Sequence, residues 1–510
     1  MDFRRFAIMV AVVGGSAVGT LPSSGMERVE VSSDNWTFRG AESKRPFVPF
    51  GVNYTPAWSG WAPDYFADGV WDRAKVERDF DDMARLGVNV VKVAFSYRRT
   101  LPDPQAAGDV RPYQPVLDRI DEMLDIAGKR GIRLILTFNA GWHGFPAWYE
   151  EGGGWFGPGS HDIVSAFWKR FAREHRGDGR IFAYSFCVEM DNEITNGWKT
   201  PEALANFRAW LRREYDDSLE RLNAAWKTTY PSWDAIAIPG FDGYNATDWK
   251  NHPEGTDANE NKTGDRHLYD YLLFREYAQF RFVHFQAQAI KAEDPGALCT
   301  MGLIQWQPFL RQIFDPVNEG PIRGPEGNAK EMAKALDCLG IHFYPVLPLG
   351  EEQDDIQLGY LELWARYAHA GKPVLLGEFN AGPEDRNARW VERVIRRTRG
   401  VVSGWMVWTF QNVQPSDNIT EVCGLIDAQR RPTALGRRFP RLSAEVQKWK
   451  LKRKPSGRIE RLDKMELFTS GNYRRMIDRK LFETYEYGTD FAIESNRSID
   501  RLISGAAHHR

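Results

Sequence analysis

An alternation of helical spacing and short apolar runs organises this chain between residues 46 and 409. The spacing over 71–86 is that of an amphipathic helix, Gly87 follows it, and an apolar run at 88–95 comes next. A helix that ends on glycine and gives way to a buried strand is the βα unit of parallel sheets. The repetition of this unit predicts a parallel sheet covered by helices.

Eight apolar runs have the length of buried strands. They lie at 46–53, 88–95, 132–138, 181–189, 298–304, 336–343, 373–379 and 402–409. Eight strands that alternate with helices predict an α/β fold of the (β/α)8, or TIM barrel, type. Residues 201–266 interrupt the alternation after the fourth run, so we expect a long insertion on the face where loops shape a cleft.

The chain of 510 residues divides into three parts on this interpretation. We expect a signal peptide at 1–25, the barrel domain at 26–448, and a linker with a charged C-terminal extension of unassigned role at 449–510. Alternating residues at 28–38 predict a small hairpin that plugs the floor of the barrel.

The N-terminus has the pattern of a secretory signal. Arg4 and Arg5 precede an apolar stretch at 6–19 that is too short to span a bilayer. We therefore expect a secreted or periplasmic protein, with an uncleaved anchor as the alternative, and no transmembrane segment later in the chain. The formal net charge of −2 gives no reason to expect nucleic acid as a partner.

Four cysteines are too few for a disulfide framework in a chain of this size. Three of them lie inside apolar runs, where cysteine serves as a small buried hydrophobe, so we expect mostly free thiols. The sequence has no His-Glu-x-x-His motif and no tight cluster of metal ligands. We expect no cofactor, although a metal-dependent enzyme on the same barrel remains an alternative.

Two carboxylates end two of the apolar runs. Glu193 closes the segment that begins with the fourth run, and Glu378 closes the seventh. Strands four and seven face each other across an eight-stranded barrel, so the two carboxylates are expected to meet over the cleft. Hydrolysis of a glycosidic bond needs such a pair, and a separation of about 5–5.5 Å leads to retention of configuration.

With Asn192 directly before Glu193, and with Glu378 at strand seven, the chain resembles the clan A glycoside hydrolases over residues 47–448. The resemblance implies that Glu193 is the general acid/base and Glu378 the nucleophile. It also implies that Asn192 holds the 2-hydroxyl of the attacked sugar.

Other residues resemble glycoside hydrolase family 5, the cellulase and mannanase family. His342 and Tyr344 match its His-x-Tyr at strand six, and Trp408 matches the tryptophan beneath the sugar at strand eight. Two positions depart from that family. Lys92 stands where an arginine is usual, and Asn139 stands where a histidine is common; we expect both to line the substrate site.

The insertion is similar to family 42, the β-galactosidases of the same clan. The similarity lies in Asp191-Asn-Glu193, in Phe145-Pro-Ala-Trp148 and in the stretch from Trp210 to Trp226.

Seven tryptophans fall in predicted loops after strands, and Trp142 is the one that we place at the substrate. They are Trp58, Trp61, Trp142, Trp148, Trp155, Trp198 and Trp306. A row of such rings suits a groove for a β-linked polysaccharide, and a loop that closes one end suits a pocket for a terminal sugar. We expect a retaining β-glycoside hydrolase of endo-β-mannanase or β-glucanase type. The alternatives are an exo-acting β-galactosidase or related enzyme, and a non-catalytic carbohydrate-binding barrel.

Overall fold

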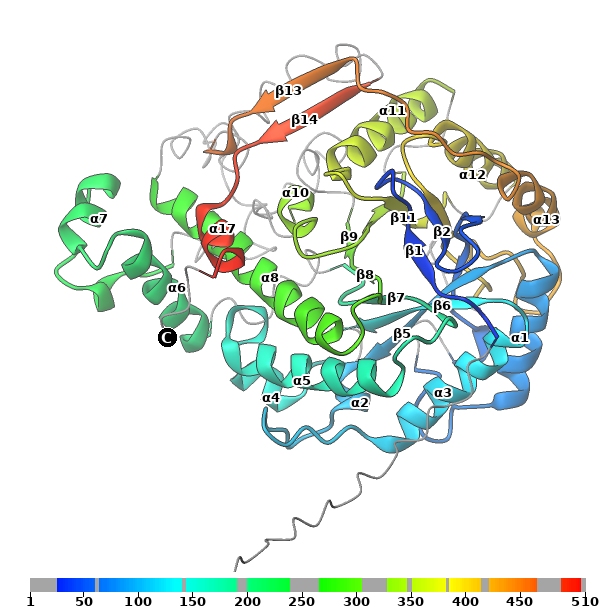
Figure 1. The fold of residues 1–510 in the computed structure, drawn as a ribbon, viewed down its shortest axis with the longest axis horizontal. Helices are drawn as coiled ribbons and strands as arrows, with labels where there is room; N and C mark the ends of the chain where they lie inside the picture. The colour runs from blue at the N-terminus through cyan, green and yellow to red at the C-terminus, as the bar shows by residue number, and fades with distance from the viewer. Residues whose placement is uncertain are drawn as a thin grey trace, which may run out of the picture.

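Parallel strands form the centre of the molecule (Figure 1). The computed structural model describes residues 25–59, 64–139, 144–189, 200–238, 266–304, 328–345, 351–381, 385–413, 422–465 and 488–505. The strands of the central sheet are β4 (Phe50–Asn53), β5 (Val90–Ser96), β6 (Arg133–Asn139), β7 (Ile181–Ser185), β8 (Cys299–Thr300), β9 (Gly302–Leu303), β10 (Leu339–Phe343), β11 (Val374–Phe379) and β12 (Gly404–Val407).

The sheet closes on itself through the fifth apolar run. Its order is β8-β7-β6-β5-β4-β12-β11-β10-β9, and every pairing is parallel. Because β8 and β9 are separated by Met301 alone, they are two halves of one strand, which pairs with β7 on one side and β10 on the other. The predicted (β/α)8 barrel is confirmed.

Helices surround the barrel. The long ones are α1 (Arg73–Arg85), α3 (Gln114–Gly128), α5 (Pro158–Glu174), α8 (Arg266–Glu293), α11 (Glu351–Ala368), α12 (Asp385–Arg397) and α13 (Ala434–Val446), and the short ones are α2 (Tyr97–Thr100), α4 (Ala147–Glu151) and α10 (Ala329–Met332). Helix α1 shows why they form where they do. The Asp72 side chain caps its first turn, a buried face carries Phe80, and Gly87 takes the left-handed φ of 81° just after its end.

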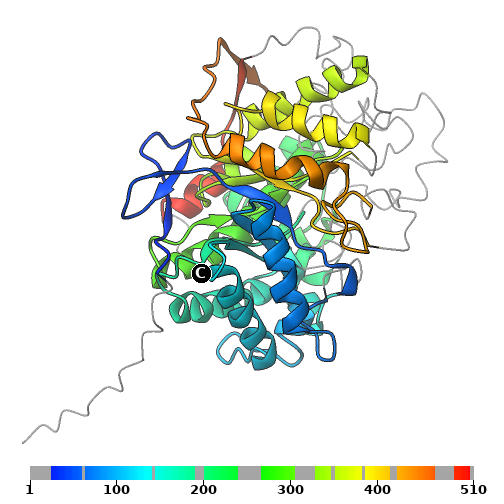
Figure 2. The same ribbon diagram turned by 90° about the vertical axis from the view of Figure 1, so that its right-hand side faces the viewer.

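The N-terminal hairpin closes the amino end of the barrel. Strands β1 (Val29–Val31), β2 (Phe38–Gly40) and β3 (Pro46–Phe47) form a small antiparallel sheet, which crosses the barrel in Figure 1 and lies at one end in Figure 2. Phe38 packs on Phe182 with 5.2 Å between ring centroids. Both belong to a buried cluster contributed by the hairpin and by the first inward layer of the barrel strands. The predicted plug is confirmed.

The insertion after the fourth strand contains α6 (Pro201–Glu214) and α7 (Leu219–Trp226), which project from the barrel beside α8 (Figure 1). Thr200 and Ser218 cap the two helices through their side-chain oxygens. Trp210 is buried, and its indole N–H donates to the Ser498 hydroxyl at 2.9 Å. The insertion is therefore fastened to the C-terminal part of the chain.

The C-terminal extension lies against the barrel helices. Strands β13 (Arg458–Leu462) and β14 (Thr489–Ile493) pair in parallel beside α11, and α17 (Arg497–Ile503) packs on α8. Between them, the ammonium of Lys464 lies 2.7 Å from a Glu276 oxygen and 3.4 Å from a Glu331 oxygen. All three side chains are at most 2% exposed. The division at residue 448 stays a prediction.

Two smaller expectations concern the thiols and the membrane. All four cysteines are buried and none forms a disulfide, in agreement with the expectation of mostly free thiols. Among the helices that the structure describes, none combines the length and the apolar character needed to cross a bilayer.

Candidate active site

Glu378 lies buried near the carboxyl end of β11, with a hydrogen-bond donor on each of its oxygens. The Lys92 ammonium, from β5, lies 2.9 Å from Oε1, and the Tyr344 hydroxyl, just past β10, donates to Oε2 at 2.8 Å. The side chains of Lys92 and Glu378 are only 7% and 5% exposed. An ion pair so withdrawn from water keeps the carboxylate in one orientation.

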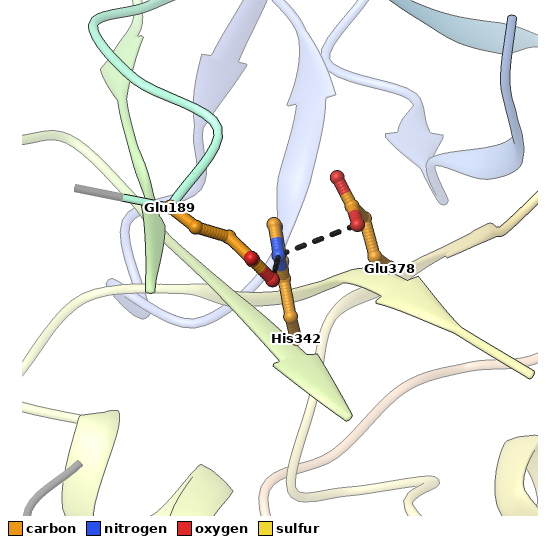
Figure 3. Close-up of side chains that lie close together, drawn as sticks. All are labelled: Glu189, His342 and Glu378. Atoms are coloured by element: carbon orange, nitrogen blue, oxygen red, sulfur yellow. Dashed lines mark hydrogen bonds and ion pairs between the residues drawn. The ribbon is translucent and has the colours of Figure 1, made fainter. Parts of the chain in front are cut away.

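His342 joins this pair to another carboxylate (Figure 3). Its Nε2 lies 3.3 Å from the Lys92 ammonium, and its Nδ1 lies 2.8 Å from Oε1 of Glu189 and 3.5 Å from Oε2 of Glu378. Burial lowers the pKa of His342 to about 3 and outweighs the opposing pull of Glu378. The imidazole is therefore neutral at the pH at which most enzymes work.

Tyr344 stays protonated for the same physical reason. Its pKa is raised well above the ordinary tyrosine value, first by burial and then by the neighbouring charges of Glu378 and Glu189. A phenol that keeps its proton can serve Glu378 only as a donor.

Two glycines leave the space that the His342 ring occupies. A Cβ on Gly302 of β9 would lie 2.7 Å from His342 Nε2, and one on Gly377 of β11 would lie 3.4 Å from the same atom. The amide of Asn53, at the end of β4, donates to the Gly377 carbonyl at 3.0 Å. The strands on both sides of β10 thus set the position of the ring.

Trp408 lies just beyond β12 and is 6% exposed. The Asn380 amide donates to its carbonyl at 2.8 Å and to the Cys423 sulfur at 2.7 Å. These contacts hold the backbone in place at Trp408, just beyond β12, which is the strand that pairs with β4.

The structure thus brings together four of the residues that the sequence predicted for the site: Lys92, His342, Tyr344 and Glu378. Asn192, Glu193 and Trp142 lie outside the described residues. Asn139 ends β6, where its backbone pairs with Ser96, and its side chain lies outside the described part.

Sequence reasoning missed Glu189. The predicted fourth strand runs to this residue, whereas β7 ends at Ser185, so the chain leaves regular pairing before it. Its place at the end of an otherwise apolar run could have identified it, because a buried charged group requires a partner.

Three of the seven loop tryptophans are described, and they serve packing. Trp148 and Trp155 are buried, and the indole N–H of Trp148 donates to the Leu101 carbonyl at 2.8 Å. The indole N–H of Trp58 donates to the buried Asp79 carboxylate at 2.9 Å. Trp61, Trp142, Trp198 and Trp306 lie outside the described residues.

Glu189, His342 and Glu378 present ligand atoms within 4.8 Å of one another, a spacing that would suit a metal ion. The Lys92 ammonium, however, already lies within hydrogen-bond distance of Glu378 and His342. The Lys92 ammonium therefore supplies a positive charge beside these side chains, and the arrangement supports chemistry by carboxylates.

Comparison with protein families adds one match. The model of glycoside hydrolase family 42, described as beta-galactosidase, matches residues 163–411, just under half of the chain. No curated protein matches the sequence.

Several solved structures share the fold at low identity. A catalytic mutant of Gan42B, a GH42 beta-galactosidase from G. stearothermophilus, has a TM-score of 0.66 at 15% identity, over 92% of this chain and 67% of that one. The exo-beta-1,4-mannosidase Op5Man5 from Opitutaceae bacterium strain TAV5 has a TM-score of 0.59 at 17% sequence identity. The match covers 91% of this chain and 72% of that one. GH5_18-E140A from Bifidobacterium longum subsp. longum, in complex with Manb1-4GlcNAc, has a TM-score of 0.55 at 14% sequence identity. The match covers 89% of this chain and 94% of that one.

A parallel barrel with a fixed carboxylate on its seventh strand, together with the family match, defines the protein as a glycoside hydrolase of clan A. It is a glycosidase, and the predicted resemblance to the clan is confirmed. Within the clan, the matching family is that of the β-galactosidases.

Proposed function

We propose that this glycosidase hydrolyses β-linked glycosidic bonds with retention of configuration, with Glu378 as the nucleophile and Glu193 as the general acid/base. The observation that carries the proposal is the geometry of Glu378. Its carboxylate is buried at a strand end and receives one donor on each oxygen, from Lys92 and Tyr344. These donors hold the carboxylate in one orientation, from which it can attack the anomeric carbon.

The reaction then takes two displacements. A Glu378 oxygen forms a bond to the anomeric carbon while the bond to the leaving oxygen breaks, and Glu193 gives its proton to that oxygen. In the second step Glu193 takes a proton from water, the water oxygen bonds to the anomeric carbon, and Glu378 is released. Asn192 is assigned to the sugar 2-hydroxyl, and Trp408 to an apolar sugar face.

The substrate that we propose is a β-linked polysaccharide or oligosaccharide, cut by an endo-acting enzyme of β-mannanase or β-glucanase type. Two observations favour a second candidate, an exo-acting β-galactosidase or related β-glycosidase. The matching family model is described as beta-galactosidase. In addition, Trp148 and Trp155 are buried in the packing, which removes them from a row of stacking subsites.

Substitution of the two carboxylates tests the mechanism. Glu378→Gln and Glu193→Gln should each reduce turnover by roughly 1,000-fold or more, because no other group replaces the nucleophile or the acid. Steady-state rates on an aryl β-glycoside measure the effect, and the exposed Glu174→Gln, on α5, is the control. If both variants stay within a few-fold of the wild type, the mechanism is wrong.

A release assay distinguishes the two substrate candidates. Oligosaccharides released from β-mannan, β-glucan or xylan establish the endo-acting enzyme, and turnover of aryl β-galactoside, β-glucoside or β-mannoside alone establishes the exo-acting one. The assay uses the mature chain, because we propose that residues 1–25 are removed when the protein is secreted or exported to the periplasm. The intact mass of the exported chain checks this removal.

A further inference from the structure

Exposed cations gather on the outside of the barrel along α12, α13 and the segment that follows α13. The two helices pack side by side (Figures 1 and 2). The segment after α13 returns to the end of α12, where the Lys454 N–H donates to the Gly400 carbonyl at 2.8 Å. The two helices and this segment therefore form one surface.

Some of the cations on this surface are paired with the carboxylates that it carries. Arg396 of α12 pairs with Glu445 of α13. Glu392 of α12 lies 3.6 Å from Arg438 and 3.7 Å from Arg441, both on α13. These pairs join the two helices and occupy both carboxylates.

Six further cations on this surface are exposed and pair with no carboxylate in the part of the chain that the structure describes. We call them the basic face: Arg389, Arg399, Arg437, Lys448, Lys450 and Lys452. Like charges on one face repel one another, and an anionic partner relieves that repulsion. Since the formal net charge of the whole chain is −2, the rest of the molecule is negative and repels the same partner. A polyanion is therefore attracted to one side only.

An aromatic ring lies among these cations. Trp449, between Lys448 and Lys450 in the chain, is half-buried, and the Arg399 guanidinium lies 4.9 Å from the centroid of its ring. Indole rings offer sugars an apolar stacking surface, and the arginine fork donates to acidic groups through two N–H bonds. Cations beside an indole therefore suit a partner that has both sugar rings and negative charges.

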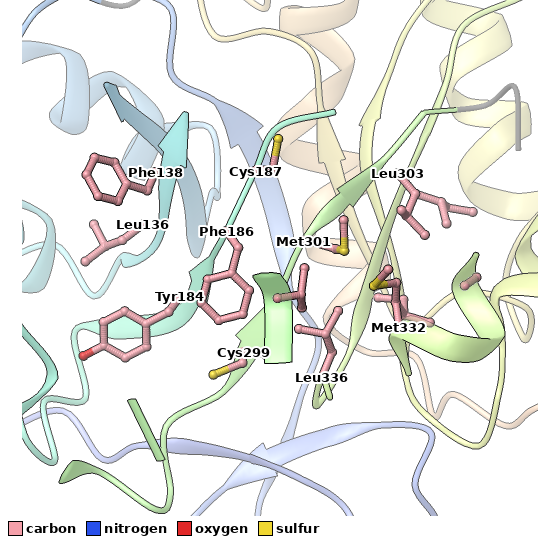
Figure 4. Close-up of a cluster of buried hydrophobic side chains, with 14 of the residues drawn as sticks. Leu136, Phe138, Tyr184, Phe186, Cys187, Cys299, Met301, Leu303, Met332 and Leu336 are labelled. Atoms are coloured by element: carbon pink, nitrogen blue, oxygen red, sulfur yellow. The ribbon is translucent and has the colours of Figure 1, made fainter. Parts of the chain in front are cut away.

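The basic face carries no large apolar side chain that is fully exposed and could enter a bilayer. Large apolar side chains mostly lie inside the molecule, as in the buried cluster of Figure 4. Among the described residues, the exposed ones are Tyr113, Ile459 and Ile503, and none belongs to this face. Helices that lie on membranes combine cations with apolar residues that insert between the lipids. The composition of the basic face therefore favours a soluble polyanion.

We propose that the basic face binds an anionic polysaccharide, with carboxylate or sulfate groups on its exposed cations and a sugar ring on Trp449. The face lies on the outer helices, whereas Glu378 lies inside the barrel at a strand end, so the two sites do not overlap. Binding here holds the enzyme on a polymer and leaves its reacting groups free. The inference goes beyond the proposed function and does not depend on it, because binding is measured without turnover.

Affinity electrophoresis of the full chain tests the proposal. We expect native gels that contain polygalacturonate or dextran sulfate to retard the wild type, neutral dextran to leave its mobility unchanged, and added salt to weaken the retardation. Both acidic polymers are α-linked, so the proposed active site does not take them as substrates.

A triple variant tests the basic face itself. Lys448→Gln with Lys450→Gln and Lys452→Gln should bind the acidic polymers about 10-fold less tightly, because each exposed ion pair contributes modestly and three are lost. Lys129→Gln with Lys169→Gln and Lys227→Gln removes the same charge from exposed positions elsewhere and is the matched control. Circular dichroism checks that both variants are folded.

Three outcomes overturn the proposal. In the first, neither acidic polymer retards the wild type, and in the second, the triple variant and its control are retarded equally. In the third, phosphatidylserine vesicles or duplex DNA bind the wild type more tightly than both polysaccharides. If the lysine variant does not fold, Arg389→Gln with Arg437→Gln repeats the test on the two helices. A wild type that is inactive on every glycoside tested, yet is retarded through the basic face, would count against the proposed function alone.

Discussion

Each carboxylate oxygen of Glu378 accepts one hydrogen bond. The Lys92 ammonium donates to Oε1, and the Tyr344 phenol donates to Oε2. The lysine stands where the sequence comparison with family 5 led us to expect an arginine. A guanidinium can contact both oxygens of a carboxylate, whereas an ammonium is a point charge. In this site the second oxygen is left to Tyr344, and Lys92 turns another of its protons to His342.

Removal of the phenolic hydroxyl tests this division. We expect Tyr344→Phe to reduce kcat by roughly 10- to 100-fold, because a hydrogen bond to a charged group contributes about 1.5–3 kcal/mol. Steady-state kinetics on an aryl β-glycoside measures it. Tyr113→Phe is the control, since Tyr113 donates to Asp68 on the surface. Unchanged kinetics in Tyr344→Phe would show that Lys92 alone orients Glu378.

The extension that carries β13, β14 and α17 is joined to the barrel helices by buried polar contacts. Besides the ion pair of Lys464 with Glu276, the Asn496 amide donates to Glu276 at 2.7 Å, and the Asn496 backbone N–H donates to Glu331 at 2.7 Å. Two carboxylates therefore lie in the interior beside the Lys464 ammonium, and one of them, Glu331, also pairs with the Lys334 ammonium at 2.6 Å.

Removal of the Lys464 ammonium should destabilise the whole protein. We expect Lys464→Met to lower the free energy of unfolding by about 3–5 kcal/mol, since it leaves the buried carboxylate of Glu276 without its cation. Thermal unfolding followed by circular dichroism measures the loss. Lys44→Met removes an exposed ion pair with Glu30 and should cost less than about 1 kcal/mol. Equal melting temperatures for the two variants would mean that the extension does not contribute to stability.

Several buried histidines make the stability of the whole molecule sensitive to acid. Burial lowers the pKa of His161 and His342 to about 3 and that of His369 to about 4. In the unfolded chain the pKa of each histidine returns to about 6.5. At any pH between the folded and the unfolded pKa, the unfolded state therefore binds more protons than the folded state. Their contribution to stability is complete above pH 6.5 and is lost as the pH falls towards the folded values.

His161 isolates this effect. Its Nε2 donates to the Trp155 carbonyl at 2.8 Å, and its Nδ1 has no partner among the described residues, so a second proton would be buried unpaired. Between about pH 6.5 and pH 4.5, the wild type should lose roughly 2–3 kcal/mol more stability than His161→Gln, whose amide can still donate to Trp155. Melting temperatures of both proteins across this range check it, and parallel curves would contradict it.

Most of the fold could be predicted from the local sequence, because the residue pattern within each βα unit indicates where its helix and its strand begin and end. The helix predicted over 71–86 is observed at Arg73–Arg85, and the strand predicted over 373–379 at Val374–Phe379. The prediction failed at the fourth run, where regular pairing ends at Ser185, because hydrophobicity does not show where a strand leaves the ladder.

Periodicity and the order of elements were enough to predict the barrel, its plug, the strand ends at which Glu378, His342 and Tyr344 lie, and the strand that carries Lys92. The folded structure was needed to show that His342 lies between Lys92 and Glu189. It also decided that Trp148 and Trp155 are buried, and that Lys464 lies between two buried carboxylates. The reason is physical: the pattern along one segment specifies its own face and ends, whereas these contacts join residues far apart in the chain, and only packing determines which of them meet.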